Sequence, residues 1–458
     1  MNMRSARASF AVVGHPNKGK SSIVSTLARD DSILISQQSG TTTDSDRYKI
    51  DTGHAGFELI DTPGFQRPQK VLYWLNQHAD SADQRVSAVE KLINDADCQS
   101  RFPDEVKLLT PLVKGAAILY VVDGSRPYGV EYEAEMEILR WTGRPSMALI
   151  NPIENDDYVE SWQNALGQFF KIVRVFNPMQ ADFSKQLALL EAFSHLELRW
   201  KETLKQVVLD LKAHQQANIV QSSILLSELL VDLCSYQTQQ KVLSESQAKA
   251  LHPILSKQYH QWMKNREQQA FGKLCQIFAH QQCDLHNDDI HLPPDLFDSK
   301  QWYAWGLNKK QLAIVSAMTG AAAGAAIDIA VAGHSFMLGA ISGGVAGFTS
   351  AWFGADKLTT IKLVGLPLGG FQACQGPIHS INFPYVVIGR FLHLFEQLKV
   401  KNHADRSSIT LSEGGLKEKL ELLQKTESKA LHLVCKNLSA QKSNENLQQV
   451  LLVLFDVD

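Results

Sequence analysis

The sequence lacks several features that would set it apart from ordinary globular proteins. Its six cysteines include no CxxC pair, a scattered pattern that is typical of reduced thiols rather than of a disulfide framework. Its formal net charge of −3 leaves no global basic surface for nucleic acid, so nucleic acid is not an expected partner. No long apolar stretch follows the basic N-terminus, and we therefore expect no export signal and a cytoplasmic location.

Glycine is also scarce, with 28 in 458 residues, yet eight glycines lie between Gly320 and Gly354. The surrounding run, 311–355, contains Asp328 as its only acidic or basic residue apart from His334. Spacings of the small-x-x-x-small type allow helices to pack closely, so we expect a Gly/Ala-rich helical hairpin here. Each arm has the roughly 20 residues that span a bilayer.

Two interpretations of this hairpin stay open. In the first, the hairpin enters or lies on a membrane, although a charged Asp328 would cost about 2.5–3.5 kcal/mol at the centre of a membrane helix. In the second, its helices pack tightly inside a globular domain, although such a long uncharged run is unusual for helices that face solvent. The sequence favours membrane association slightly.

A glycine-rich loop follows the first apolar run of the chain. Residues 9–13 read SFAVV, and the next eight residues fit the pattern G-x-x-x-x-G-K-S. The glycines let backbone amides point at phosphates, the lysine adds positive charge and the serine hydroxyl suits Mg²⁺. The predicted phosphate-binding residues are Gly14, His15, Pro16, Asn17, Lys18, Gly19, Lys20, Ser21 and Ser22.

Two further polar motifs follow in order. Residues 39–44 read SGTTTD, a loop with hydroxyl groups suited to Mg²⁺ and a terminal phosphate. Residues 61–64 read DTPG at the end of an apolar run, where Asp61 can hold Mg²⁺ through a water and Gly64 can offer its N–H to the phosphate. Each motif alone is weak, because a stretch such as DTPG is usually a turn. The three motifs in this order are a strong signal.

Apolar strands alternate with helical patterns over the first 200 residues. We expect strands at 9–13, 47–52, 56–60, 116–122, 147–150 and 171–176, and helices at 22–28, 131–141, 158–169 and 185–196. This alternation predicts an α/β fold with a mostly parallel six-stranded sheet covered by helices on both faces. A ligand should lie at the carboxyl ends of the strands, where the polar motifs fall.

The motifs GHPNKGKSS, SGTTTD and DTPG resemble those of the Era-like bacterial GTPases, and the resemblance covers about residues 9–197. It implies a P-loop domain that binds GTP and GDP, requires Mg²⁺ and hydrolyses GTP as a molecular switch. It also implies that Thr42, or one of its neighbours Thr41 and Thr43, joins Ser21 and Asp61 at Mg²⁺.

The same resemblance assigns catalytic roles to Lys20, Thr42 and Gly64. Asn17 matches the asparagine that coordinates an activating K⁺ in some members. Phe65, however, follows DTPG where many small GTPases carry a glutamine that orients water. Hydrolysis would then need another source of water positioning.

The base-reading motif departs from the family pattern. Members read guanine with Asn-Lys-x-Asp, whereas residues 151–154 here read Asn-Pro-Ile-Glu. Asn151 is retained, and the Glu154 carboxylate can accept hydrogen bonds from guanine N1–H and its amino group. Pro152 cannot replace the lysine, so we expect GTP with weakened base selectivity. The alternative is a plain turn that ends the strand.

The chain is expected to divide into a GTPase domain at 1–197, a long-helix region with an acidic linker at 198–301, and a mainly α-helical domain at 302–458. The predicted function is a GTP-hydrolysing switch whose nucleotide state controls the helical part, which engages a membrane surface or a protein partner. A dimer of the GTPase domain and an anchor at the inner face of the membrane are also considered. The alternative is a structural or membrane-scaffolding protein with a weakly hydrolysing nucleotide site.

Overall fold

The computed structural model describes residues 7–29, 46–242, 245–279, 352–354, 362–363, 366–367, 371–401 and 415–456. The chain forms two compact units, of which unit 1 is Met1–Gln215 with Val400–Ser407, and unit 2 is Gln216–Lys399 with Ser408–Asp458. Thr42 and residues 311–351 of the expected hairpin lie outside the described residues. The domain boundaries after residues 197 and 301 stay predictions.

Unit 1 is built on a six-stranded sheet with the order β2-β3-β1-β4-β5-β6. Its strands are β1 (Ala8–Val13), β2 (Asp46–Asp51), β3 (Gly56–Asp61), β4 (Ala117–Asp123), β5 (Ser146–Asn151) and β6 (Ile172–Val175). All neighbouring strands are parallel except β2, which pairs antiparallel with β3. The predicted mostly parallel six-stranded sheet is therefore confirmed.

Hydrophobic cores lie on both faces of this sheet, because successive side chains of a strand point to opposite faces. Phe10 and Val12 of β1 belong to one core and Ala11 and Val13 to the other. The first core includes α1 (Lys20–Ala28), α8 (Phe183–Phe193) and the start of α9 (Lys201–Ser235), and the second includes α6 (Glu131–Trp141) and α7 (Val159–Leu166). The sheet is thus covered as expected for parallel strands.

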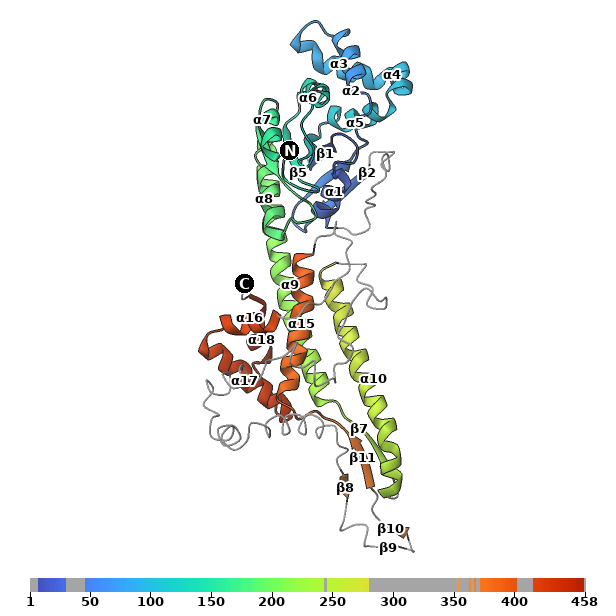
Figure 1. Cartoon of the computed structure of the whole chain (residues 1–458), viewed down its shortest axis with the longest axis vertical. Helices are drawn as coiled ribbons and strands as arrows, with labels where there is room; N and C mark the ends of the chain where they lie inside the picture. The colour runs from blue at the N-terminus through green and yellow to red at the C-terminus, as the bar shows by residue number, and fades with distance from the viewer. Residues whose placement is uncertain are drawn as a thin grey trace, which may run out of the picture. The chain divides into compact units, whose positions relative to one another are not determined.

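Four helices separate β3 from β4: α2 (Pro68–Asn76), α3 (Arg85–Asn94), α4 (Ala96–Arg101) and α5 (Pro103–Val113). Figure 1 shows α2, α3 and α4 gathered together at the top of the view. From the sequence, Pro103 and Pro111 are both expected to break the helical pattern of this segment. Pro103 does so, because α4 ends at Arg101 and Pro103 starts α5, at a position whose N–H would have no partner within the helix. Pro111 does not, because it lies inside α5.

Unit 2 combines long helices with a small sheet. Its helices are the part of α9 from Gln216, α10 (Glu245–Ile277), α15 (Asn382–Val400), α16 (Gly415–Leu422), α17 (Lys425–Ser439) and α18 (Leu447–Asp456). The strands β7 (Thr238–Val242), β11 (Phe371–Gln375) and β8 (Trp352–Gly354) form an antiparallel sheet, drawn at the lower end of α10 in Figure 1. The strands β9 (Lys362–Leu363) and β10 (Leu366–Pro367) form a separate pair.

Residues 196–242 contain no proline or glycine and have a helical pattern, which predicts one long helix or two, but the structure confirms this only in part. The helix ends at Ser235, and residues 238–242 form β7 because their backbone groups pair with β11. One described helical segment, Leu198–Ser235, is long and apolar enough to cross a membrane by length and composition. Half of its most apolar stretch is buried within the structure, and a core helix of a globular protein can meet the same criteria of length and composition.

The main core of unit 2 is a cluster in which α9, α10, α15, α17 and α18 pack together, and a smaller cluster joins β7, α10 and β11. A bidentate ion pair lies within the main core. Arg390 of α15 donates from Nε to Oε1 and from Nη2 to Oε2 of Glu267 in α10, at 2.7 and 2.8 Å. The two side chains are only 4% and 5% exposed, so the charge of each is compensated by its partner rather than by water.

Replacing Glu267 with alanine should lower the free energy of unfolding of unit 2 by about 3–5 kcal/mol, because the Arg390 charge stays buried without its partner. Urea titration followed by circular dichroism measures the change. Gln268→Ala, an exposed neighbour on the same helix, should change stability by less than about 0.5 kcal/mol. Equal stability of the two variants would contradict the importance of the pair.

Candidate nucleotide-binding site

The loop between β1 and α1 curls in a conformation that most residues avoid. Gly14, Asn17 and Gly19 all have positive φ, at 141°, 59° and 84°. A Cβ on Gly14 would lie 2.4 Å from the carbonyl oxygen of Val121 in β4, so only glycine fits there. The loop therefore has the backbone geometry predicted for a phosphate cradle, immediately before the N-terminus of α1.

Lys20 is buried at the first position of α1. Its Nζ donates to the carbonyl oxygens of His15 at 2.9 Å and Gly14 at 3.4 Å. Burial lowers the pKa of Lys20 to about 8, while the carboxylates of Asp61 and Glu135 oppose this shift. A lysine held this way can exchange loop carbonyls for phosphate oxygens, which would satisfy its charge better.

Ser21 and Asp61 meet beside Lys20. The Ser21 hydroxyl donates to Asp61 Oδ2 at 2.6 Å, and Asp61 is the buried last residue of β3. The next residue, Thr62, fixes the DTPG turn by donating from Oγ1 to the carbonyl oxygen of Val12 at 2.7 Å. A hydroxyl and a carboxylate are hard oxygen donors, so this pair fits Mg²⁺.

The DTPG turn also contacts the P-loop directly. Phe65 is fully buried, and its N–H donates to the carbonyl oxygen of Gly14 at 3.2 Å. A Cβ on Gly64 would come within 2.5–2.8 Å of Pro16, which requires glycine at that position. The structure thus brings the predicted phosphate-sensing residue Gly64 against the P-loop.

Glu105 is a site residue that the sequence did not reveal. It lies in α5, is 1% exposed, and accepts hydrogen bonds from the backbone N–H groups of Gln66 and Arg67. No local motif marks it, because its partners lie far away in sequence and are backbone groups. It ties the four helices between β3 and β4 to the turn after Gly64.

A second buried carboxylate lies behind the P-loop. Glu135 of α6 accepts a hydrogen bond from the Tyr120 hydroxyl at 2.9 Å and lies 2.9 Å from Nδ1 of His15. Burial first, and the Glu135 charge second, raise the pKa of Tyr120 well above its usual value. The phenol is therefore a stable donor, and the three residues support the loop from β4 and α6.

Asn151 ends β5 and lies against the P-loop. Its Nδ2 donates to the carbonyl oxygen of Lys18 at 3.1 Å, and a Cβ on Gly19 would be 2.3 Å from the same nitrogen. Its Oδ1 is buried and, among the described residues, has no hydrogen-bond partner. The loop after it is fixed by Asn177, which donates from Nδ2 to the carbonyl oxygen of Pro152 at 2.9 Å.

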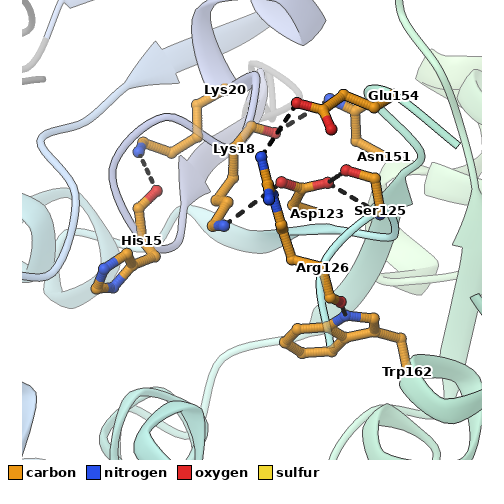
Figure 2. Close-up of polar contacts among 9 residues, drawn as sticks. All are labelled: His15, Lys18, Lys20, Asp123, Ser125, Arg126, Asn151, Glu154 and Trp162. Carbon is orange, nitrogen blue, oxygen red and sulfur yellow. Dashed lines mark hydrogen bonds and ion pairs between the residues drawn. The ribbon is translucent and has the colours of Figure 1, made fainter. Parts of the chain in front are cut away.

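Polar and charged residues from the P-loop, from the end of β4 and the loop after it, and from the loop after β5 complete this side of the site, as Figure 2 shows. Lys18 Nζ lies 3.5 Å from Asp123 Oδ2, and Ser125 donates to Asp123 Oδ1 from both its N–H and its hydroxyl. Arg126 Nη2 donates to Glu154 Oε1 at 3.1 Å. The sequence motifs did not identify three of these site residues, Asp123, Ser125 and Arg126. Asp123 could have been suspected, because it ends a strand that lies next to β5.

Comparisons with known proteins agree with this geometry. Residues 9–151 match the family described as 50S ribosome-binding GTPase, and residues 163–451 match a domain of unknown function, DUF3482. GTPase Era of Fusobacterium nucleatum is 23% identical over 191 residues, which are 40% of this chain and 55% of that protein. GTPase Der of a Bradyrhizobium species is 30% identical over 116 residues, 25% of each chain.

The chain thus spans about half or less of the length of these curated relatives. A solved structure of Aquifex aeolicus Era bound to GDP and aluminium fluoride aligns with 59% of this chain and 88% of its own, at 14% identity and a TM-score of 0.29.

The matched family, the strand order and the motifs at the ends of β1 and β3 define unit 1 as a P-loop GTPase domain of the Era-like class. The second family match begins in α7 and ends within α18, and it covers more than half of the chain. The chain as a whole belongs to the family of the domain of unknown function DUF3482.

The lowered pKa of Lys20 predicts a pH dependence of nucleotide binding. Phosphate favours the charged ammonium, so GDP affinity should fall as pH rises from 7 to 9, approaching a tenfold loss per unit above pH 8. Isothermal titration calorimetry measures it. Lys20→Arg serves as the control, since arginine stays charged over this pH range. Any pH dependence of GDP affinity in this variant reports the ionisation of the nucleotide itself. Parallel pH profiles for the two proteins would contradict the role of Lys20.

Proposed function

We propose that unit 1 binds GTP and GDP with Mg²⁺ and hydrolyses GTP. The observation that carries this proposal is the meeting of Lys20, Ser21 and Asp61 at the carboxyl ends of β1 and β3. The named activity of the relatives, GTPase, supports it. We propose for the site residues the same phosphate-binding, metal-binding and base-binding roles that the sequence predicts.

The chain's own residues have separate tasks in this proposal. The P-loop amides and Lys20 bind and orient the phosphates, and the N–H of Gly64 donates to the terminal phosphate. Ser21 and Asp61, with Thr42 from the undescribed loop, would hold Mg²⁺, which neutralises charge on the phosphate oxygens when bound. Asn151 and Glu154 would accept hydrogen bonds from the base.

Asn17 motivates a proposal of K⁺ stimulation. Its positive φ keeps it at the outer bend of the P-loop, between Pro16 and Lys18. A side-chain amide oxygen is a suitable ligand for a monovalent cation near the phosphates. A K⁺ held there would supply positive charge at the point where negative charge develops during hydrolysis.

A second candidate function is a scaffold whose nucleotide site barely hydrolyses GTP. Phe65 favours it, because this side chain is fully buried and apolar where a water-orienting group would be useful. Pro152 favours it too, since it offers the base no side-chain donor. The two candidates differ in turnover rather than in nucleotide binding.

We further propose that the nucleotide state controls the helical part of the chain, which would act on a protein partner or on the inner face of the cytoplasmic membrane. The near-absence of charge in residues 311–355 motivates the membrane proposal. Dimerisation of the GTPase domain remains part of the proposal as a source of hydrolytic groups in trans.

GTP turnover tests the first proposal. The full chain with Mg²⁺ should release phosphate from GTP faster in K⁺ than in Na⁺, and Asn17→Ala should remove the difference between the two salts. Lys20→Ala should reduce turnover by about 10²–10³-fold, the usual cost of removing a group that stabilises the transition state. A malachite-green phosphate assay measures each rate.

Three outcomes of this assay are informative. Turnover no higher than that of Lys20→Ala, with GDP binding intact, would favour the scaffold. Equal use of ATP and GTP would contradict guanine selection. Equal rates in K⁺ and Na⁺ would contradict the role given to Asn17.

Liposome flotation tests the membrane proposal. The full chain should float with lipid vesicles in at least one nucleotide state, because residues 311–355 are apolar and include a single acidic residue, Asp328. The charged variant Ala322→Lys/Ala340→Lys should float less. Sedimentation of the unaltered protein in the GTP, GDP and nucleotide-free states would refute membrane binding.

A further inference from the structure

The base-binding side of the proposed site has an acid without the usual lysine beside it. Residue 152 is proline, which can neither donate a hydrogen bond from its side chain nor supply charge. Glu154 has one more methylene than the aspartate of the family pattern and is 61% exposed. A longer and freer side chain loses more rotamer freedom when it takes one orientation, so it needs a neighbour that fixes it.

Arg126 is that neighbour. Its Nη2 donates to Glu154 Oε1 at 3.1 Å, and Figure 2 shows its side chain passing in front of Asp123 toward Glu154. The carboxylate retains further acceptor capacity after this bond, because each ionised carboxylate offers about four acceptor positions. One carboxylate can therefore bind Arg126 and a purine at the same time.

The backbone of Arg126 is fixed from a buried anchor. Trp162 of α7 is fully buried and donates from Nε1 to the carbonyl oxygen of Arg126 at 2.8 Å. The N–H of Arg126 donates to the carbonyl oxygen of Asp123 at 3.3 Å. The side chain thus extends from a well-defined point.

The two loops that carry Arg126 and Glu154 are joined by backbone hydrogen bonds. The N–H of Gly124 donates to the carbonyl oxygen of Asn151 at 2.8 Å, and the N–H of Tyr158 donates to the carbonyl oxygen of Gly124 at 3.2 Å. A Cβ on Gly124 would lie 2.8 Å from Ile150, so the loops approach closely. The separation between the backbones of the two loops is consequently set by the fold.

We propose that Arg126 is a positioning residue that orients Glu154 toward the purine and so sets the selection of guanine in this chain. This inference rests on the proposed function. The exposed ion pair contributes little by itself, but a base lying over it would exclude water and strengthen it. Arg126 thereby supplies, from a different loop, the positive charge beside the acid that Pro152 cannot supply.

Guanine, hypoxanthine and adenine differ in the hydrogen-bond donors that they present to Glu154. Guanine presents both N1–H and a 2-amino group to a carboxylate, hypoxanthine presents N1–H alone, and adenine presents neither. Only a correctly oriented carboxylate can bind both guanine donors. The ratio of GDP affinity to IDP affinity therefore measures orientation, and a change in overall stability of the loop would not alter it.

The test is displacement of a fluorescent GDP analogue from the full chain by GDP, IDP and ADP in Mg²⁺. Glu154→Ala should weaken GDP binding about tenfold, the scale of a hydrogen bond to a charged group, and IDP binding less. Arg126→Ala should lower the GDP-to-IDP ratio by a similar factor, and Arg126→Lys should restore part of it. The double variant should be no worse than Glu154→Ala alone, because both changes remove one interaction.

Arg140→Ala is the matched control, since Arg140 is an exposed arginine of unit 1 that pairs with Glu137 in α6 and should leave the ratio unchanged. An unaltered protein that binds no GDP would refute the proposed function and the inference together. Normal GDP binding with an unchanged ratio in Arg126→Ala would overturn the inference alone. Additive effects in the double variant, or tighter GDP binding by Arg126→Ala, would also overturn it.

Discussion

The conformation of the six residues between β1 and α1 is the constraint on which the rest of the site depends. Positive φ angles at Gly14, Asn17 and Gly19 turn the chain sharply, and such angles are unfavourable for most residues. The surroundings hold the loop in this shape: β4 packs against Gly14, Asn151 against Gly19, and the DTPG turn donates a backbone hydrogen bond to Gly14. The sheet therefore supports the loop from three strands at once.

Much of unit 1 could be predicted because local patterns and tertiary structure agree there. All seven residues of β4 are buried, so the strand reads as a continuous apolar run, and the helix expected at 131–141 has exactly those bounds. The P-loop, Asp61 and Gly64 could be found because phosphate chemistry requires particular residues at particular spacings.

Other features could not be predicted because they depend on distant partners. The segment Thr238–Val242 reads TQQKV, which has a polar and helix-compatible composition, and it becomes a strand only by pairing with Phe371–Gln375. Glu105 and Arg126 belong to no spacing rule, since one binds backbone amides and the other binds a glutamate on a different loop. Such contacts are a property of the folded chain, and a single sequence does not display them.

The carboxylate of Glu105 has a consequence for how the four-helix segment between β3 and β4 can change. Gln66 and Arg67 follow the DTPG turn directly, and their amides are satisfied by this one acid. Trimming the segment to an ordinary loop would remove the acceptor that both amides share and leave water as their partner, so the turn after Gly64 would lose its connection to α5. The helices accordingly support this turn rather than merely decorate the domain, and any shortened version of this protein would need another residue to hold the turn at that point.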